Sequence, residues 1–186
     1  MKIFNKATKI LLITNSLILF AGGMIGPIYA FFVKEIGGTL LDASYTFGTF
    51  AFVVGIVTLI SGRYADKIKE NELIIVLGYL ILGVGFFGYI FVNSIIFLLV
   101  IQIIIGFGEA IYAPAFDAIY SKHLDKKVLG SGWGTWEAMN YFTTAIAALG
   151  GGILVTFFDF NIIFIIMSLL CFISAIYILF LPRVVL

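Results

Sequence analysis

Charge is what this sequence most lacks. Asp, Glu, Lys and Arg make up 11% of its 186 residues, whereas a soluble domain carries about 25%. Hydrophobic residues make up 62% of the chain, which is more than a water-soluble core of this size can bury. The composition therefore excludes the soluble enzyme classes, and we expect most of the molecular surface to lie in lipid.

Cysteine and net charge are also nearly absent. The single cysteine, Cys171, cannot form an internal disulfide, and its apolar neighbours in the sequence indicate inert packing. A net charge of +1 favours neither nucleic-acid binding nor a polybasic arm. We expect no nucleic-acid partner, and we expect neither a metal nor a cofactor.

Long uncharged runs are what the sequence has instead, and they predict six transmembrane helices. The first run, residues 10–33, is long enough to span a bilayer and too long for the apolar part of a secretory signal peptide, which is the alternative. The predicted spans are residues 10–33, 43–62, 73–93, 94–121, 128–158 and 159–181, with a hairpin turn at Asn93 and Ser94. Because barrel-type alternation is absent, the predicted fold class is an all-α membrane protein.

Two short segments recur later in the chain at nearly the same distance. Residues 47–50 match residues 133–136 in an aromatic-Gly-Thr-aromatic pattern, and residues 11–15 lie over residues 98–102. The second pairing also aligns Pro27 with Pro114, and both prolines are expected to kink their helices. We interpret residues 1–93 and 94–186 as two copies of one three-helix unit. Since three is an odd number, the second copy is inverted in the membrane, which is typical of transporters.

Lys and Arg gather on one side of the predicted spans. Only Lys34 lies on the other side. The remaining ones precede the first span, follow the last or lie in two loops: Lys2, Lys6, Lys9, Arg63, Lys67, Lys69, Lys122, Lys126, Lys127 and Arg183. The positive-inside rule then predicts a multi-pass protein of the plasma membrane with both termini in the cytoplasm.

Polar residues form a stripe on each of the first, fourth and fifth predicted helices. Stripes of helical period on an apolar background predict a common cavity, while the third and sixth helices, nearly free of polar side chains, are predicted to face lipid. The alternative is hydrogen bonding between helices for packing alone. The candidate cavity-lining residues are Asn15, Gln102, Trp133, Trp136, Asn140 and Tyr141.

Two acids, Glu109 and Glu137, fall well inside predicted spans. A rise of 1.5 Å per residue places them roughly 22 Å from Ser94 and roughly 13 Å from Val128, inside a hydrocarbon core about 30 Å thick. A charge there costs at least about 2.5 kcal/mol, and no Lys or Arg lies inside a span to neutralise it. The pattern indicates proton coupling or a cationic substrate. The alternative is a structural hydrogen bond made by a neutral carboxyl group.

One loop carries a family resemblance. The segment Gly62-Arg63-Tyr64-Ala65-Asp66-Lys67 resembles the first part of the signature loop of the major facilitator superfamily, Gly-x-x-x-Asp-(Arg/Lys). The later part of that signature, Gly-Arg-(Arg/Lys), is replaced by Lys69-Glu70-Asn71. Gln102, Gly106 and Gly108 match the spacing of a second family motif, with Gln102 in place of its usual Arg. The resemblance covers all six predicted helices.

Members of this family usually have twelve helices, in two six-helix halves around a central cavity. The resemblance implies that this chain is one such half, that its first and fourth helices line the cavity, and that Gly62, Asp66 and Lys67 form a cytoplasmic gate. Gly48, Gly55 and Gly62 also form a smooth strip on the second helix for a close neighbour.

We therefore predict a secondary active transporter that moves a small solute by alternating access. It acts as a parallel homodimer joined through the second and fifth helices, with proton coupling through the two acids. The first alternative is the amino-terminal half of a split or longer transporter that needs a different carboxyl half. The second is a six-helix substrate-binding subunit of a vitamin uptake complex.

Overall fold

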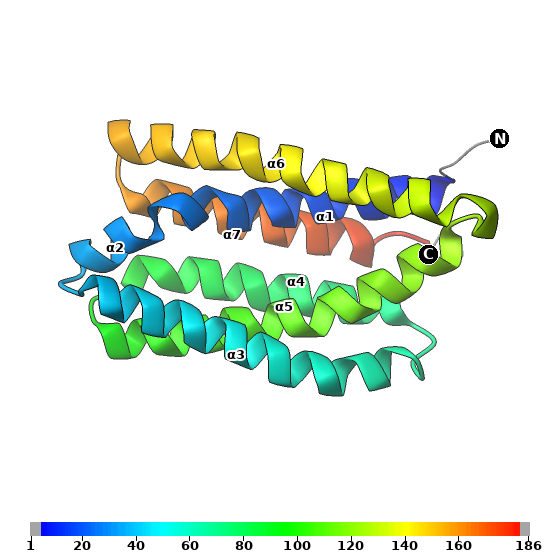
Figure 1. Cartoon of the computed structure of the whole chain (residues 1–186), viewed down its shortest axis with the longest axis horizontal. Coiled ribbons are helices and arrows are strands. Elements are labelled where there is room, and N and C mark those ends of the chain that lie inside the picture. The colour runs from blue at the N-terminus through cyan, green and yellow to red at the C-terminus, as the bar shows by residue number, and fades with distance from the viewer. Residues whose placement is uncertain (1–4, 183–186) are drawn as a thin grey trace.

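The computed structural model describes residues 5–182, which form six helical spans (Figure 1). Lys2 and Arg183, two of the cationic residues that predict the orientation, lie outside the described residues. All six spans are long and apolar enough to cross a membrane. The predicted all-α fold class and number of spans are confirmed for this part of the chain.

The first span has three parts: α1 (Lys6–Ile25), a 3-10 turn (Gly26–Ile28) and α2 (Tyr29–Glu35). The second is α3 (Leu40–Ala65), and the third is α4 (Asn71–Gly88) with a 3-10 turn (Tyr89–Phe91). The fourth is α5 (Ile95–His123). The fifth is a 3-10 turn (Lys126–Val128) with α6 (Leu129–Phe157), and the sixth is α7 (Phe160–Leu179).

Short polar side chains determine where several helices begin. Asn5, Ser94 and Asp159 each accept a hydrogen bond from a backbone N–H in the first turn of α1, α5 and α7. Thr39 and Asp42 form a reciprocal capping box at the start of α3. Such caps satisfy N–H groups that have no partner inside the helix. The turn predicted at Asn93 and Ser94 is confirmed.

The two prolines act differently. Pro27 lies in the 3-10 turn that separates α1 from α2, so the predicted kink in the first span is confirmed. Proline removes a backbone donor and its ring crowds the preceding turn, which favours such a break. Pro114 lies inside α5, which continues through it as one α-helix.

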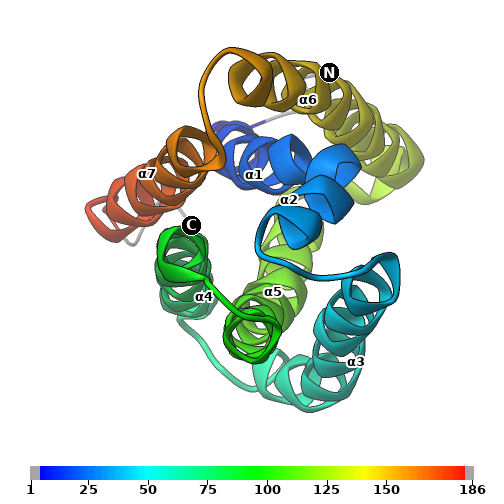
Figure 2. The same cartoon turned by 90° about the vertical axis from the view of Figure 1, so that its left-hand side faces the viewer.

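The helices pack in two groups that join where α4 lies against α7 (Figure 2). α1 packs on α6 and α7, α5 packs on α3 and α4, and α4 packs on α7. Exchanging α1 with α5, α3 with α6, and α4 with α7 leaves this pattern unchanged. Figure 1 also shows α1 and α5 running in opposite directions. Two inverted repeats require this symmetry, and the repeat boundaries at residues 1–93 and 94–186 stay a prediction.

α4 and α7 each have two apolar faces. The inner faces carry fully buried residues such as Tyr79 and Phe164, and the outer faces carry exposed ones such as Leu77 and Leu169. Ser168 on α7 ties the two helices by donating a 2.9 Å hydrogen bond to the Gly83 carbonyl. The two helices predicted to face lipid therefore expose one side and form the core with the other.

Glycine lets α4 and α5 cross closely. A Cβ added at Gly78 would lie 2.5 Å from the Cβ of Tyr112 and 2.8 Å from the carbonyl oxygen of Gly108. A Cβ added at Gly108 would lie 3.0 Å from the Gly78 carbonyl oxygen. The two backbones are thus in contact, which fixes the position of α5 and of the polar residues on it.

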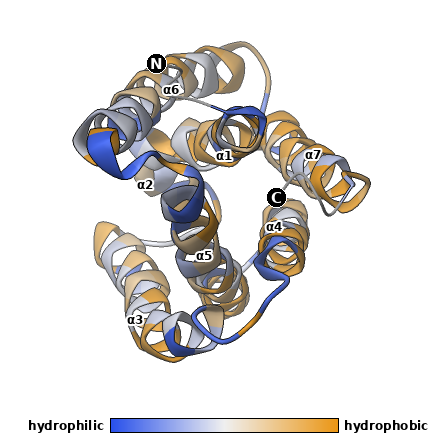
Figure 3. Cartoon of the chain, turned by 90° about the vertical axis from the view of Figure 1, so that its right-hand side faces the viewer, coloured by the Kyte–Doolittle hydropathy of each residue, from blue (hydrophilic) through white to orange (hydrophobic). Residues whose placement is uncertain are grey.

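The two ends of the described chain lie at the same end of the bundle (Figure 1). The loops from α3 to α4 and from α5 to α6 lie at this end too, and Figure 3 shows their hydrophilic residues facing the viewer. Arg63 lies in the last turn of α3, Lys67 in the loop after it and Lys126 between α5 and α6, whereas Lys34 lies in the last turn of α2 at the opposite end. The charge asymmetry predicted from the sequence is therefore present along the long axis of the bundle.

Candidate functional site

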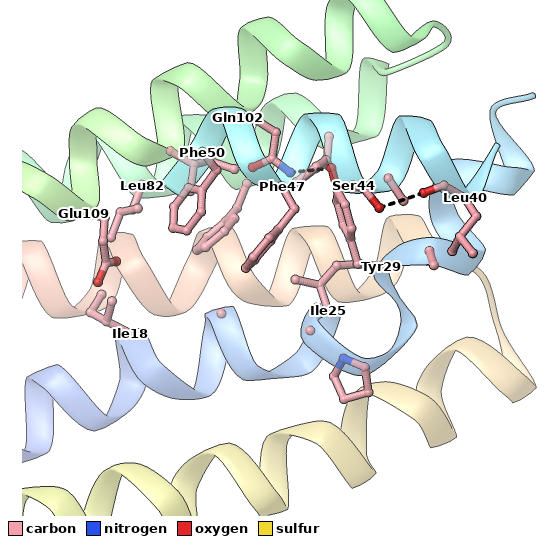
Figure 4. A pocket seen from close by; sticks show the side chains of 18 residues that line it. Ile18, Ile25, Tyr29, Leu40, Ser44, Phe47, Phe50, Leu82, Gln102 and Glu109 are labelled. Carbon is pink, nitrogen blue, oxygen red and sulfur yellow. Dashed lines mark hydrogen bonds between the residues drawn. The ribbon is translucent and has the colours of Figure 1, made fainter. Parts of the chain in front are cut away.

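A cavity of about 450 Å³ lies between the first span, α3 and α5, with α4 behind it (Figure 4). Its wall is mostly apolar and includes the aromatic side chains of Phe47, Phe50 and Phe86. Figure 4 shows Glu109 at one end of the cavity and Leu40 at the other, with Tyr29 between them. Its volume lies within the range of about 300–1,000 Å³ that suits small-molecule sites.

Helical spacing brings the polar groups of α5 onto this wall. Gln102 and Glu109 are seven residues apart, so they share one face of α5 and lie roughly 10 Å apart along it. On the opposite wall, Gly22 and Gly26 of the first span line the cavity, and a Cβ added at either would meet nothing within 4 Å. The missing side chains leave the space that the cavity occupies.

A chain of hydrogen bonds joins three spans beside the cavity. The amide nitrogen of Gln102 donates to the hydroxyl of Tyr29, which donates to Thr46 Oγ1 at 2.6 Å. Thr46 in turn donates to the carbonyl oxygen of Asp42 at 2.7 Å. Gln102 is 4% exposed and Thr46 is buried. Each hydrogen bond in this series is therefore donated in the direction from α5 to α3.

A second polar cluster, which we call the Asn15 cluster, consists of Asn15, Tyr79 and Trp136. The indole N–H of Trp136 donates to Asn15 Oδ1 at 3.0 Å, and Asn15 Nδ2 donates to the Tyr79 hydroxyl at 3.5 Å. The Tyr79 ring packs edge-on against the Tyr112 ring at 5.0 Å, and the Tyr112 hydroxyl donates to Glu109 at 3.2 Å. The cluster thus connects α6, through α1 and α4, with the acid that lines the cavity.

The structure brings only some of the predicted residues together. Gln102 and Glu109 line the cavity, whereas Asn15, 1% exposed, and Trp136 belong to the Asn15 cluster inside the bundle. Sequence reasoning did not single out Ser44 or Phe50, which also line the cavity. One hydroxyl and one phenyl group in apolar helices give no periodic signal.

The remaining candidates on α6 lie away from the cavity. Trp133 packs against Tyr120 at 5.1 Å, and Asn140 accepts a hydrogen bond from Thr144 at 3.3 Å. Tyr141 is 72% exposed, and Glu137 is exposed one turn before it. The described chain alone therefore does not bring Glu137 to the cavity that contains Glu109.

The residues of the signature loop end α3. Asp66 is the C-terminal capping residue of α3, and its N–H donates to the Gly62 carbonyl at 3.3 Å. The side chains of Asp66 and Lys67 are exposed. Asn71 bonds across the loop to the carbonyl of Ala65 at 3.0 Å. The loop is therefore held by backbone hydrogen bonds and by the side chain of Asn71, and the Asp66 carboxylate stays on the surface.

α3 and α6 are the least covered helices. Only 11% of the residues in their apolar stretches are buried, against 50% in α4. A Cβ added at Gly48 or Gly55 of α3, or at Gly130 or Gly134 of α6, would meet nothing within 4 Å. Within residues 5–182, Gly48 and Gly55 of the predicted glycine strip have no close neighbour. They lie instead on an open face of the bundle.

The Asn15 cluster yields a stability prediction. Asn15→Ala removes two hydrogen bonds and leaves the Trp136 N–H without its acceptor in a dry interior. We expect the free energy of unfolding to fall by about 1–2 kcal/mol, measured as thermal stability in detergent. Thr49→Ala is the control, because Thr49 is half-buried and its hydroxyl bonds to Tyr45 of its own helix, not to another span. Equal losses in both variants would show that the cluster does not hold the helices together.

The sequence is similar to those of known membrane proteins. The sequence pattern that defines the Major Facilitator Superfamily matches residues 11–185. YitZ of Bacillus subtilis, described as an uncharacterized MFS-type transporter, is 24% identical over 83% of this chain and 94% of its own length. MJ1560 of Methanocaldococcus jannaschii, described in the same words, is 29% identical over 80% of this chain and 36% of its own. The multidrug resistance protein MdtG of Dickeya zeae is 24% identical over 90% of this chain and 42% of its own. The chain thus spans nearly all of YitZ and less than half of the other two.

Proposed function

The chain belongs to the major facilitator superfamily, a family of membrane transporters, and from that premise we propose that it is a secondary active transporter for a small solute. The observation that carries the proposal is the cavity of about 450 Å³, which contains a carboxyl group at the middle of a membrane-spanning helix. A charged group at that depth is expensive, and such groups in membrane proteins mark pathways for ions or substrates. The solute reaches the cavity from one side of the membrane at a time, by alternating access.

We further propose that two copies of the chain form a parallel homodimer. In a lone chain, Glu137 and the open faces of α3 and α6 would meet hydrocarbon, where a charge costs at least about 2.5 kcal/mol. A second copy, related by a two-fold axis along the membrane normal, covers these faces by placing α3 of one copy against α6 of the other. YitZ, of which this chain spans 94%, supports a unit of this size.

The second candidate is an amino-terminal half that pairs with a different carboxyl half. It is favoured by the relatives of which this chain covers 36% and 42%. A separate half would cover the same faces of α3 and α6. The two candidates differ in what the chain does alone.

The test is transport by the chain without any other protein. We expect liposomes containing only this chain to accumulate at least one class of small solute under an imposed proton gradient. We also expect mass measurement in lipid nanodiscs to find two copies of the 20.5 kDa chain in each particle. Transport that appears only when a carboxyl half is added would contradict the homodimer and favour the second candidate.

We propose that both termini are cytoplasmic, because the described cations gather at the end of the bundle where the chain starts and stops. A green fluorescent protein fused after Leu186 is expected to fluoresce, and an alkaline phosphatase at the same place is expected to be inactive. Inserting the phosphatase between Gly37 and Gly38, in the loop that follows α2, is expected to give full activity. The reverse pattern would overturn the orientation.

A further inference from the structure

The charge of the cavity wall limits which solutes fit. Among the described residues that line it, Glu109 supplies a carboxyl group, and there is no Lys, Arg or His. An anion entering this space would lose its water without meeting a positive charge, which is strongly unfavourable. A cation would meet the Glu109 carboxylate. The negative charge that Glu109 gives the cavity wall therefore favours positively charged solutes.

The direction of the hydrogen bonds leads to the same conclusion. The hydroxyl of Tyr29 donates to Thr46, and the hydroxyl of Ser44 donates to the carbonyl of Leu40 at 3.1 Å, so neither proton is available to a solute. Glu109 already accepts one hydrogen bond, from Tyr112, and its carboxylate has further acceptor sites. One amide N–H of Gln102 is used by Tyr29, while its oxygen has no partner among the described residues. The groups left for a solute are thus the acceptor sites of Glu109 and Gln102, the second amide N–H of Gln102 and the hydroxyl of Tyr89, and among them only the Glu109 carboxyl group can carry a charge near neutral pH.

The apolar wall decides which kind of cation fits. Hard metal ions such as Ca²⁺ require six or more oxygen ligands, which a wall with one carboxyl group and one amide cannot supply. The aromatic rings of Phe47, Phe50, Phe86 and Tyr89 instead favour a weakly hydrated organic cation, since a ring face attracts a cation within about 6 Å. A volume of about 450 Å³ has room for an apolar body beside the charge.

We infer that this cavity binds a monovalent organic cation with a large apolar body, with the charge held by Glu109 and the body held by the aromatic wall. The inference rests on the proposed function, because it names the class of solute that the transporter takes. It assigns the substrate charge to the cavity of a single chain. It therefore applies equally to a homodimer and to a pair of different halves.

The test uses two hydrophobic ions of nearly equal size and opposite charge, tetraphenylphosphonium and tetraphenylborate. Binding is measured by equilibrium dialysis against the purified full chain in lipid nanodiscs, with empty nanodiscs subtracted. We expect saturable binding of tetraphenylphosphonium and no saturable binding of tetraphenylborate. Equal binding of both ions, or saturable binding of tetraphenylborate alone, would overturn the inference.

Variants then identify the site. Glu109→Gln is expected to weaken tetraphenylphosphonium binding at least tenfold, and Glu109→Asp less. Asp159→Asn is the matched control. It removes a carboxylate charge at the N-terminus of α7, outside the cavity wall, and keeps the oxygen that caps the helix. Should Glu109→Gln fail to fold, Gly22→Leu provides a second test, since it fills the cavity where a Cβ meets nothing within 4 Å. Unchanged binding in Glu109→Gln, or in Gly22→Leu where the first does not fold, would contradict the assignment.

The solute class and the transport function can fail separately. If tetraphenylphosphonium binds in a Glu109-dependent way but liposomes never move it, the inference stands and the transporter proposal fails for this ion. If liposomes transport another solute while tetraphenylphosphonium does not bind, the transporter proposal stands and the inference is wrong.

Discussion

A disulfide is expected to join two copies of the chain when Asp66 and Ser131 are both replaced by cysteine and Cys171 is replaced by alanine. Most chains should then run at twice their mass on a non-reducing gel, whereas neither single-cysteine variant can form the link between residues 66 and 131. The pair is chosen because Asp66 ends α3, Ser131 lies in the first turn of α6, and both are exposed at the same end of the bundle.

The physical basis is the contact that the homodimer would make there. The backbone N–H groups at the start of α6 carry about half a positive charge, and a nearby carboxylate gains about 0.3–1 kcal/mol from them. In the proposed homodimer, Asp66 of one copy against α6 of the other would act as a latch that exists only while this end of the cavity is closed. Within one chain the two positions lie on opposite sides of the bundle, because α3 and α6 flank it on either side (Figures 1 and 2).

The control is a cysteine at Thr156, which is exposed near the other end of α6, in combination with Asp66→Cys. This pair should not cross-link. A solute that opens the end carrying the termini should reduce the link between residues 66 and 131. The homodimer is wrong if native membranes show no link under any condition and the chain stays monomeric in lipid, and a separate carboxyl half then becomes the better proposal.

Tetraphenylphosphonium binding is expected to weaken about tenfold for each unit by which the pH falls below the midpoint of Glu109 titration. The sign follows from the charge: a protonated carboxyl group is neutral and cannot balance the cation, so the proton and the cation exclude each other. Each cation bound under these conditions should release about one proton, which a pH dye in weak buffer detects. The other ionisable groups around Glu109 are the hydroxyls of Tyr79 and Tyr112 and the thiol of Cys171, whose ordinary pKa values of about 10 and about 8.5 lie above neutral pH.

Glu109→Gln should make the remaining binding independent of pH. Glu137→Gln tests the second acid separately, because Glu137 lies on the open face of α6 and not on the cavity wall. Fewer protons released per cation in this variant would make Glu137 part of the coupling. Proton release that persists unchanged in Glu109→Gln would contradict a role for Glu109.

The sequence predicts features that follow from local chemistry. Six long apolar runs and the polar break at Asn93 and Ser94 predict the number of helices and the start of α5, because a helix in lipid satisfies its own backbone. Glu109 stands out because a charge inside an apolar run is costly. Gln102 stands out because its polar side chain recurs at helical spacing with Glu109, and the structure places both on one wall.

Pairings between distant helices could not be predicted in this way. Asn15 and Trp136 are both polar residues on striped helices, and the sequence cannot distinguish a residue that lines a cavity from one that bonds to another helix. The answer depends on how far α1 and α6 are rotated about their axes. That rotation is set by packing on α7 and by the symmetry of the two groups of helices, which no single helix encodes.

The helix α1 packs mainly on α6 and α7, which are made last, and this affects how the protein is synthesised. Asn15 and Trp136 are 121 residues apart, and ribosomes add about 5–20 residues per second, so α1 waits roughly 6–24 s for its partner on α6. During that time the side-chain oxygen of Asn15 lacks the donor that it has in the folded protein, and lipid cannot replace it. A nascent chain that stops after α4 has made none of the main contacts of α1, so residues 1–93 alone are expected to be degraded rather than to persist as a folded unit.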